Sequence, residues 1–387
     1  MAISSTRGDS QARDGLVRWA EIDVAALRHN TEAVRARLQP PAQLLAMVKS
    51  DGYGHGAETA ARAALAGGAT WLGVYTPHEA LALREAGIDA RLLVVGWSPP
   101  SVVPALVAHD VDFTVFDAGG ARAARDAASR EGNARIHIKI DSGLGRLGAR
   151  PESLGELVDA LRDASGAVEV VGIFTHFADA EGDPDFTREQ HRRFLDAVQR
   201  FRPVAPDALL HTCGSAAILN FPEMHHDLVR LGIAMYGYAP RELQPPVQLR
   251  PVMSVFARVA QVKTVDKGES VGYGRTWWAP AQRRIATVAI GYGQGLPRNL
   301  SNHGQLVVGG HRCTIAGTVN MDQVTLDVTD AGPVEPGDVA LFFGEHGGVR
   351  LGADEVAALA GTIPHEVLCG VAARVPRFVT GGPASNG

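Results

Sequence analysis

Short apolar runs alternate with longer amphipathic stretches over more than half of this chain. Runs that are apolar throughout are typical of strands buried on both faces, and their alternation with helical patterns indicates parallel βαβ units. Eight such runs in succession predict a (β/α)8 (TIM) barrel, with a doubly wound open sheet as the alternative. The runs are Leu44–Lys49, Thr70–Tyr75, Arg91–Trp97, Val111–Phe116, Arg135–Asp141, Glu169–Thr175, Ala208–Thr212 and Leu228–Tyr236.

The stretches between the runs are rich in Ala, Leu, Arg and Glu and predict helices. A first helix precedes the set, with Asp23 as a plausible N-cap and with Leu27, Val34 and Leu38 on one face. The clearest later helices are expected at Pro77–Ala86, Ala118–Glu131, Pro151–Ala164 and Phe186–Phe201.

The pattern changes after about Arg250, where β-rich segments are separated by Gly, Pro, Asp and Asn. Only Ala353–Ala360 is clearly helical there, so the sequence predicts an α/β chain with an N-terminal TIM barrel over 16–248 and a C-terminal mainly β domain over 249–387. Residues 1–15 are polar and are expected to form a disordered leader without a secretion signal. The β-rich segments are Ser254–Val265, Arg284–Tyr292, Gln305–Val308, Cys313–Thr318, Gln323–Val328 and Val339–Phe343.

Composition excludes several classes of protein. The chain is 45% hydrophobic and 20% charged, which suits a large globular core. A net charge of -5 gives no basic field for nucleic acid, and no stretch approaches the roughly 20 apolar residues of a membrane helix. The three cysteines are far apart and lack metal spacing, so neither a disulfide framework nor a metal site is expected. A cytoplasmic enzyme is the resulting expectation.

Residues able to carry chemistry gather at the ends of the predicted barrel strands. Of the 37 basic residues only four are lysines, and two of these, Lys49 and Lys139, end the first and fifth runs. His176, His211 and Arg230 belong to the last three runs or follow them. The C-terminal ends of barrel strands form one rim, where catalytic groups of TIM barrels lie. A lysine, unlike an arginine, can lose its proton and become a nucleophile or a base.

The loops after the seventh and eighth runs are predicted to bind a phosphate. They carry Gly214-Ser215 and Gly232-Ile233, which offer a hydroxyl and backbone N–H groups. A reactive lysine that faces a phosphate site indicates pyridoxal phosphate, bound covalently through the lysine.

Several motifs together resemble those of the alanine racemases, which are fold-type III enzymes that use pyridoxal phosphate. The resemblance extends from Trp19 to about Arg377, and AMVKSDGYGHGA (46–57) is similar to the family's cofactor-lysine signature. The other motifs follow in the family's order and spacing: KIDSGLGRLG (139–148), THFADAE (175–181), RLGIAMYG (230–237), VGYGRTW (271–277), IGYGQG (290–295) and NMDQ (320–323).

The resemblance implies a racemase that acts on alanine with two bases. Lys49 would hold the cofactor and exchange a proton on one face of the substrate Cα, and Tyr273 would do so on the other face. The phenol needs a neighbour to lower its pKa from about 10, and the resemblance gives His176 that role. Arg230, supported by His211, would hydrogen-bond the pyridine nitrogen and leave it unprotonated.

The resemblance also implies the remaining site residues and a homodimer. Arg146 and the backbone of Met321 would bind the substrate carboxylate, with Lys139 as a candidate for carbamylation. Tyr273 and Met321 would reach Lys49 of a partner subunit, so each active site would be shared. The residues expected to line the cofactor or substrate pocket are Tyr53, Ser215, Gly232, Ile233, Tyr292 and His365. Supply of D-alanine for peptidoglycan is the implied role.

Three positions depart from the family's pattern and leave the substrate open. His365 replaces a tyrosine that usually contacts the phosphate and narrows the pocket, Gly214 replaces a common asparagine, and Asn320 a common cysteine. A serine/alanine or broad-specificity racemase is therefore an alternative, because one methylene or hydroxyl is discriminated by only about 1–3 kcal/mol. Outside the racemases, a non-catalytic pyridoxal phosphate carrier, a decarboxylase of the same fold type and a metal-dependent barrel hydrolase stay open.

Overall fold

The computed structural model describes residues 3–4, 13–239 and 247–382. The chain divides by its contacts into two compact units, one of residues 28–52 and 60–249, the other of residues 1–27, 53–59 and 250–387. Of the leader predicted for residues 1–15, residues 1–2 and 5–12 lie outside the described part, whereas Ile3–Ser4 form strand β1. None of the helices in the described ranges is long and apolar enough to cross a membrane.

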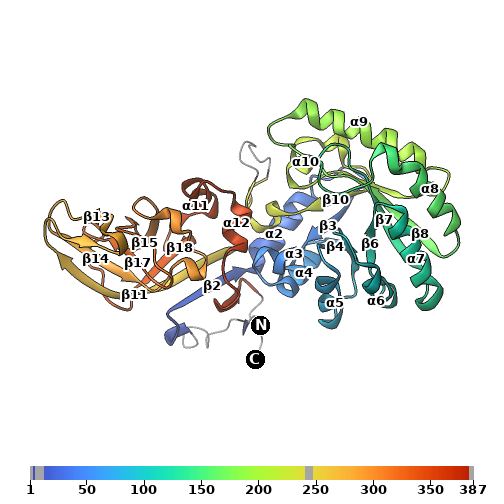
Figure 1. Ribbon diagram of the computed structural model, residues 1–387. Helices are drawn as coiled ribbons and strands as arrows, with labels where there is room; N and C mark the ends of the chain where they lie inside the picture. Colours follow the sequence, from blue (N-terminus) through green and yellow to red (C-terminus); the bar gives the residue numbers. More distant parts are fainter. Residues whose placement is uncertain (1–2, 5–12, 240–246, 383–387) are drawn as a thin grey trace. The chain divides into compact units, whose positions relative to one another are not determined.

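The first unit is the predicted barrel, and the eight expected runs all contain a strand. The strands are parallel and pair in the order β10-β3-β4-β5-β6-β7-β8-β9. Backbone hydrogen bonds from Asp227 to Leu210 (3.1 Å) and from Arg230 to Cys213 (2.9 Å) join the two ends, so the barrel is nearly closed (Figure 1). The strands are β3 (Gln43–Met47), β4 (Trp71–Val74), β5 (Arg91–Val94), β6 (Asp112–Val115), β7 (Ala134–Lys139), β8 (Val168–Phe174), β9 (Leu209–His211) and β10 (Leu228–Leu231).

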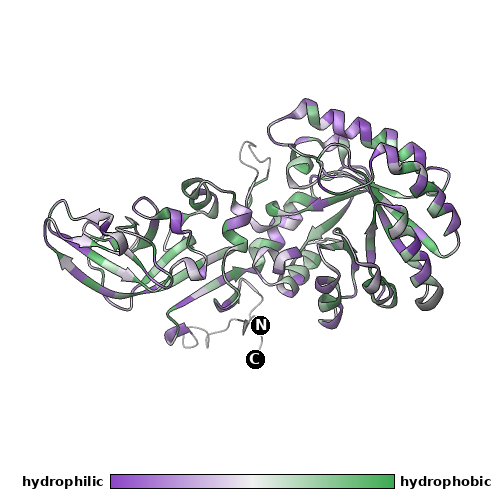
Figure 2. Cartoon of the chain, in the orientation of Figure 1, coloured by the Kyte–Doolittle hydropathy of each residue, from purple (hydrophilic) through white to green (hydrophobic). Residues whose placement is uncertain are grey.

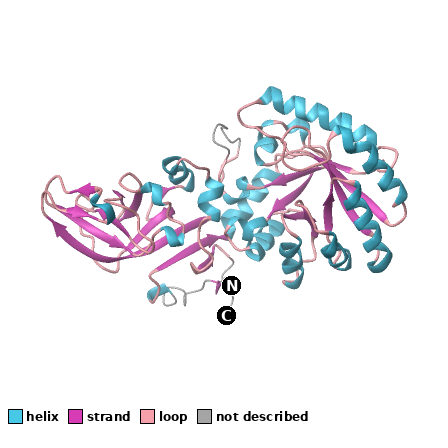
Figure 3. Ribbon diagram, viewed as in Figure 1, coloured by secondary structure: helices cyan, strands magenta, loops and turns pink. Residues whose placement is uncertain are grey.

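Helices alternate with these strands around the barrel, as Figure 3 shows. The first, α2 (Val24–Arg35), is capped by Asp23 as predicted, since the Ala26 N–H donates to Asp23 Oδ1 at 3.0 Å. The others are α4 (Ala57–Ala66), α5 (Pro77–Glu85), α6 (Val103–Ala108), α7 (Ala118–Glu131), α8 (Leu154–Asp163), α9 (Pro184–Phe201) and the short α10 (Ser215–Asn220).

At the end of two apolar runs the chain forms a helical turn in place of a longer strand. The first ends at Met47, and Lys49 begins the short helical segment α3 (Lys49–Tyr53). The eighth ends at Leu231, and the 3₁₀ helix η4 (Ile233–Tyr236) follows. The η4 turn is buried and apolar, and hydrophobicity alone does not distinguish such a turn from a strand. The turn after Val48 is exposed at Ser50 and Asp51.

The second unit is built on a mostly antiparallel sheet, as its β-rich sequence predicts. Its long strand β11 (Met253–Val265) pairs with β2 (Arg18–Asp23), β14 (Arg283–Val288) and β18 (Val339–His346). Strand β2 comes from the beginning of the chain, so the N-terminal segment is part of this sheet. The other elements are β15 (Gln305–Val308), β16 (His311–Thr314), β17 (Val324–Asp327), β19 (Val349–Leu351), β20 (Arg377–Thr380), the pair β12 (Ser270–Val271) and β13 (Trp277–Trp278), and helices α11 (Ala353–Ala360) and α12 (Pro364–Cys369).

Hydrophobic residues line the barrel strands, as Figure 2 shows, with some exceptions. Asp112, His137, His211 and Arg230 are all buried among them. Buried charged and imidazole groups are costly unless they are paired, so these side chains require an explanation.

Candidate active site

Lys49 stands at the start of an unusual left-handed turn. Ser50, Asp51 and Gly52 have φ of 54°, 52° and 61°. Each left-handed residue other than glycine costs roughly 1–2 kcal/mol, and such strain is found mostly at functional sites. The carboxylate of Glu79 holds the turn, because it accepts the Ser50 N–H at 2.6 Å. The sequence interpretation missed Glu79.

Arg230 is held by three carbonyl oxygens near the ends of neighbouring strands. Its Nη1 donates to the His211 carbonyl at 2.9 Å, and its Nη2 donates to the carbonyls of Thr175 and Thr212 at 2.7 and 2.9 Å. Burial lowers the pKa of Arg230 to about 10, so the guanidinium stays charged at neutral pH. Arg230 is therefore a fixed hydrogen-bond donor that does not release a proton.

The rings of His176 and His211 both turn Nδ1 toward this guanidinium. The distances are 3.2 Å from Arg230 Nη2 to His176 and 3.1 Å from Nη1 to His211. Because a guanidinium only donates, both Nδ1 atoms accept, and the neutral rings carry their protons on Nε2. Burial, assisted by Arg230, lowers the pKa of His176 to about 3, and burial also lowers the pKa of His211. Both rings are neutral at physiological pH.

The surroundings of His176 are strongly cationic. Arg230, Arg146, Lys139 and Lys49 all act electrostatically on this ring, and together they account for the part of its pKa shift that burial does not. Four cations within electrostatic reach of one buried ring require anionic partners to offset their repulsion. A ligand with a phosphate and a carboxylate meets that requirement.

Lys139 is the second predicted lysine, and it is 5% exposed. Burial lowers the pKa of its ammonium to about 8, with Arg230 and Arg146 contributing in the same direction and Asp141 opposing them. A substantial fraction of Lys139 is therefore neutral and nucleophilic near that pH.

The two loops predicted to bind phosphate meet in the structure. Ser215 Oγ accepts the N–H groups of Gly232 at 2.9 Å and of Ala234 at 3.3 Å. The N–H of Ile233, the first residue of η4, is not used within that helical turn and can serve a ligand. Gly214 leaves space for His176, since a Cβ at Gly214 would lie 3.2 Å from His176 Cε1.

These groups fit pyridoxal phosphate. Arg230 Nε has no hydrogen-bond partner among the described residues, so one donor of the buried guanidinium is available to an acceptor such as a pyridine nitrogen. Lys49 supplies an amine for covalent attachment, and the Ser215 hydroxyl and the Ile233 N–H supply donors for a phosphate.

Three further predicted residues gather in the second unit. Tyr273, Tyr292 and Met321 line a hollow of about 460 Å³, to which Arg298 also contributes. Backbone hydrogen bonds join two of the segments, since the Tyr292 N–H donates to the Asn320 carbonyl at 3.0 Å and the Gly293 N–H donates to the Met321 carbonyl at 2.8 Å. The sequence interpretation missed Arg298.

Tyr273 lies between two glycines with positive φ and is 73% exposed. Thr318, which the sequence interpretation also missed, fixes this turn by donating its Oγ1 proton to the Tyr273 carbonyl at 2.9 Å. The phenol is thus presented at the surface of the unit.

Tyr53 and His365 form another contact of the second unit. Their ring centroids are 5.8 Å apart, with an interplanar angle of 44°. Burial raises the pKa of Tyr53, so its phenol remains protonated. His365 occupies the second position of α12, a helix that the sequence did not predict.

Comparison with known proteins decides the family. A model of the alanine racemase N-terminal domain matches residues 22–240, and one of the C-terminal domain matches residues 252–379. The alanine racemase of Symbiobacterium thermophilum is 40% identical over 372 residues, which cover 95% of this chain and 98% of that protein. The chain belongs to the alanine racemase family.

Solved alanine racemases share the whole fold. The enzyme from the D-cycloserine producer Streptomyces lavendulae superposes with a TM-score of 0.90 at 40% identity, covering 95% of this chain and 97% of that one. The enzyme of Bacillus anthracis was solved with bound L-Ala-P. It superposes with a TM-score of 0.88 at 35% identity, covering 95% of this chain and 96% of that one. The predicted family and fold are therefore confirmed.

Family membership removes the alternatives outside the racemases. Non-catalytic pyridoxal phosphate carriers that share the barrel typically lack the C-terminal domain, which is matched here. A decarboxylase of this fold type would more typically have a carboxylate where this chain has Arg230. A metal hydrolase of this fold would use His176 and His211 as ligands, but both Nδ1 atoms face the Arg230 guanidinium and His211 Nε2 faces His137.

Proposed function

We propose that this chain interconverts L- and D-alanine with pyridoxal phosphate attached to Lys49. The observation that carries this proposal is the buried guanidinium of Arg230, held by three carbonyls in a pocket whose cations include Lys49. The test is to incubate the purified holoenzyme separately with L-alanine and L-serine and to measure both D-isomers.

The chain's own residues supply the proton transfers. Bound pyridoxal phosphate withdraws electrons from the substrate Cα and so acidifies its proton. Lys49 removes or returns that proton on one face, and Tyr273 does so on the other, since inversion needs a base and an acid on opposite faces. His176 is neutral with its proton on Nε2, so it can donate a hydrogen bond to the Tyr273 phenolate, but it cannot act there as a cation.

Arg230 sets the strength of the electron withdrawal. Its Nε–H would hold the pyridine nitrogen of bound pyridoxal phosphate without transferring a proton, because the pKa of the guanidinium stays near 10 even when buried. With the ring nitrogen unprotonated, the electron withdrawal would be weaker, which would limit transamination and other side reactions.

Arg146 binds the substrate carboxylate by forked hydrogen bonds, together with the backbone of Met321. Tyr292, which shares the hollow with Met321, lines the substrate side of the pocket. The residues that would hold the phosphate are Tyr53, Ser215, Gly232, Ile233 and His365.

Lys139 is proposed to carry a carbamate, which turns a cation beside Arg146 into an anion that orients it. The reaction with carbon dioxide needs the neutral amine, and the pKa of about 8 provides it. Lys139→Ala is expected to raise KM for alanine by about 10–100-fold, the usual effect of losing a group that orients a ligand-binding side chain. Steady-state kinetics measure the effect, with the exposed Lys263→Ala as control.

Spectroscopy tests the modification itself. ¹³C-bicarbonate should give the holoenzyme a carbamate NMR signal that is absent from Lys139→Ala. A wild-type enzyme with full activity and no such signal would contradict the proposed carbamate.

His365 is proposed to widen the substrate range. It stands where the family usually has a tyrosine, so the pocket gains room for a side chain larger than methyl. His365→Tyr is expected to lower serine turnover relative to alanine by up to about tenfold, the scale of discrimination against one hydroxyl. D-isomer formation from both substrates measures the ratio, and equal ratios in the variant and the parent would refute the role.

A homodimer with shared active sites completes the proposal. Tyr273 and Met321, which line the same hollow, are 73% and 56% exposed. Exposed apolar side chains of this kind suit a surface that binds a second copy of the chain. The D-alanine formed is proposed to supply peptidoglycan synthesis in the cytoplasm, where the free thiols of the three cysteines would persist.

A further inference from the structure

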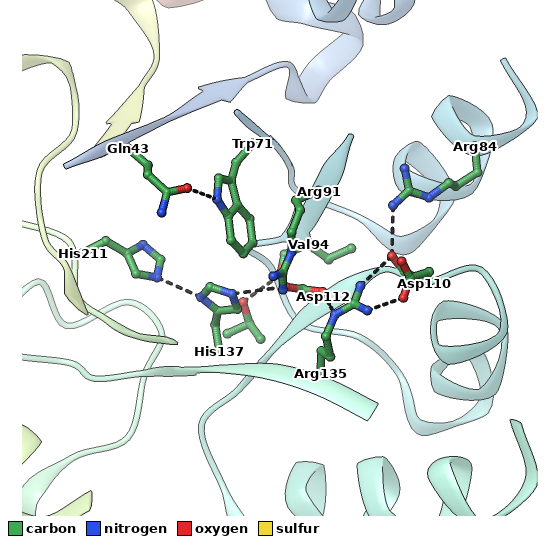
Figure 4. Close-up of polar contacts among 11 residues, drawn as sticks. Gln43, Trp71, Arg84, Arg91, Val94, Asp110, Asp112, Arg135, His137 and His211 are labelled. Carbon is green, nitrogen blue, oxygen red and sulfur yellow. Dashed lines mark hydrogen bonds and ion pairs between the residues drawn. The ribbon is translucent and has the colours of Figure 1, made fainter. Parts of the chain in front are cut away.

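A line of buried polar side chains crosses the barrel interior, and only its last member, His211, has a role in the reaction as described. Asp112, His137 and His211 come from β6, β7 and β9 and are fully buried (Figure 4). His211 Nε2 lies 2.9 Å from His137 Nδ1, and His137 Nε2 lies 3.5 Å from Asp112 Oδ2. Arg91 and Arg135 bind the same carboxylate, each at 2.7 Å.

The charged ends of this line determine where its protons lie. Arg230 only donates, so His211 Nδ1 accepts and His211 Nε2 carries the proton. That proton points to His137 Nδ1, which must accept it, so His137 carries its own proton on Nε2. The Nε2–H of His137 then faces the Asp112 carboxylate. Every N–H therefore points from the guanidinium toward the carboxylate.

A glycine on the neighbouring strand makes room for the central ring. Gly172 of β8 pairs with His137 of β7 in the barrel sheet. A Cβ at Gly172 would lie 2.4 Å from His137 Nδ1, closer than any real contact. The position of the ring, and hence its hydrogen bond with His211, depends on this glycine.

The charges along the line are consistent with the proton positions. Burial alone would raise the pKa of Asp112, but His137, Arg91 and Arg135 together lower it, so the carboxylate is an anion. Burial lowers the pKa of His137 against the opposing effect of Asp112, and Arg91 and Arg230 act in the same direction as burial. Two neutral imidazoles thus connect a buried cation to a buried anion.

We propose that Asp112 and His137 are positioning residues for Arg230, holding His211 in the tautomer that accepts a hydrogen bond from the guanidinium. This proposal rests on the proposed role of Arg230 at the pyridine nitrogen. With the opposite tautomer, His211 would present Nδ1–H to the guanidinium, and two facing donors would push Arg230 out of its alignment.

The proton positions can be measured without the cofactor. The apoprotein labelled with ¹⁵N-histidine is expected to show unprotonated Nδ1 and protonated Nε2 for both His137 and His211, with His137→Gln used for assignment. A wild-type His211 protonated on Nδ1 would overturn the proposal. Because no cofactor or substrate is present, this result is independent of whether the chain is a racemase.

Asp112→Asn tests the carboxylate, and Asp110→Asn is its matched control. Asp110 pairs with the same Arg135 but is exposed and is not among the groups that act on His137. An amide at position 112 can donate to His137 Nε2, so both rings should move their protons to Nδ1. Asp110→Asn should leave both tautomers unchanged. If the Asp112→Asn protein unfolds cooperatively on heating, and is therefore folded, and both histidines keep the wild-type tautomers, the positioning role of Asp112 is refuted.

Kinetics and a second variant separate positioning from general stability. In the holoenzyme, Asp112→Asn is expected to lower kcat about tenfold and to change KM by less than about twofold. The kcat and KM of Asp110→Asn should both stay within about twofold of the wild-type values. If Asp112→Asn does not fold, Gly172→Ala displaces His137 without removing a charge, and it should show the same loss of kcat and a weakened His211–His137 hydrogen bond. A folded Gly172→Ala with wild-type kcat and tautomers would also overturn the proposal.

Discussion

Lys49→Ala is expected to lower racemisation by about 10⁴-fold, the upper end of what one acid/base group contributes, because the same amine also holds the cofactor. The visible absorption of the lysine-bound cofactor should disappear with it. The left-handed turn after Lys49 is held through the backbone and Glu79, so the loss of the amine should leave the local fold intact.

The matched control is Lys267→Ala, which removes an exposed lysine outside the candidate site. It should leave both the activity and the spectrum unchanged. Retention of the visible band by Lys49→Ala would remove this lysine from the cofactor site, and circular dichroism of both variants would show whether the fold persists.

Tyr273→Phe is expected to lower racemisation by about 10²–10⁴-fold, because only one of the two faces then has a proton carrier. The phenol is exposed, so its removal should cost little folding stability. With Lys49 intact, the variant should still exchange the α-proton of one enantiomer with deuterated solvent, and it should do so with retention of configuration.

Proton exchange distinguishes the two-base mechanism from a one-base mechanism. Exchange of both enantiomers at equal rates in Tyr273→Phe would exclude Tyr273 as the second base. The control is Tyr75→Phe, another exposed tyrosine, which lies after β4 and outside the candidate site. It should keep wild-type rates in both directions.

Mixing the two inactive variants tests whether the sites are shared. If Tyr273 serves the partner's Lys49, a mixed dimer has one site with both lesions and one intact site. Random reassortment should then restore about a quarter of wild-type activity. If each subunit contains its own complete site, the mixture stays inactive.

Much of this could be predicted from local sequence. The eight apolar runs became eight strands because a strand covered on both faces needs an unbroken apolar run, and Asp23 capped its helix because that bond is local. Strand ends were less predictable. The turn after Met47 depends on positive φ at Ser50 and Asp51, and these residue types do not predict a positive φ. Glu79, which stabilises the turn, lies 29 positions away from Ser50 in the sequence.

The motifs predict Lys49, Arg230 and Tyr273 as site residues, but they do not show what fixes the state of these groups. Asp112 and His137 are ordinary polar residues within apolar runs, although His137 stands two positions before Lys139 on the same strand. Their proposed positioning role depends on the contact between His137 and His211, which lie 74 positions apart in the sequence.

The sequence by itself determined the secondary structure periods, the change from α/β to β-rich pattern and the residue types able to hold pyridoxal phosphate, since these follow from local pattern and side-chain chemistry. Only the tertiary structure decided the protonation states. The neutrality of His176, the pKa of about 8 for Lys139 and the direction of the Arg230–Asp112 line arise from burial and from charges that distant strands bring together. Electrostatic energies depend on distance and solvent exposure, and the closed barrel sets both.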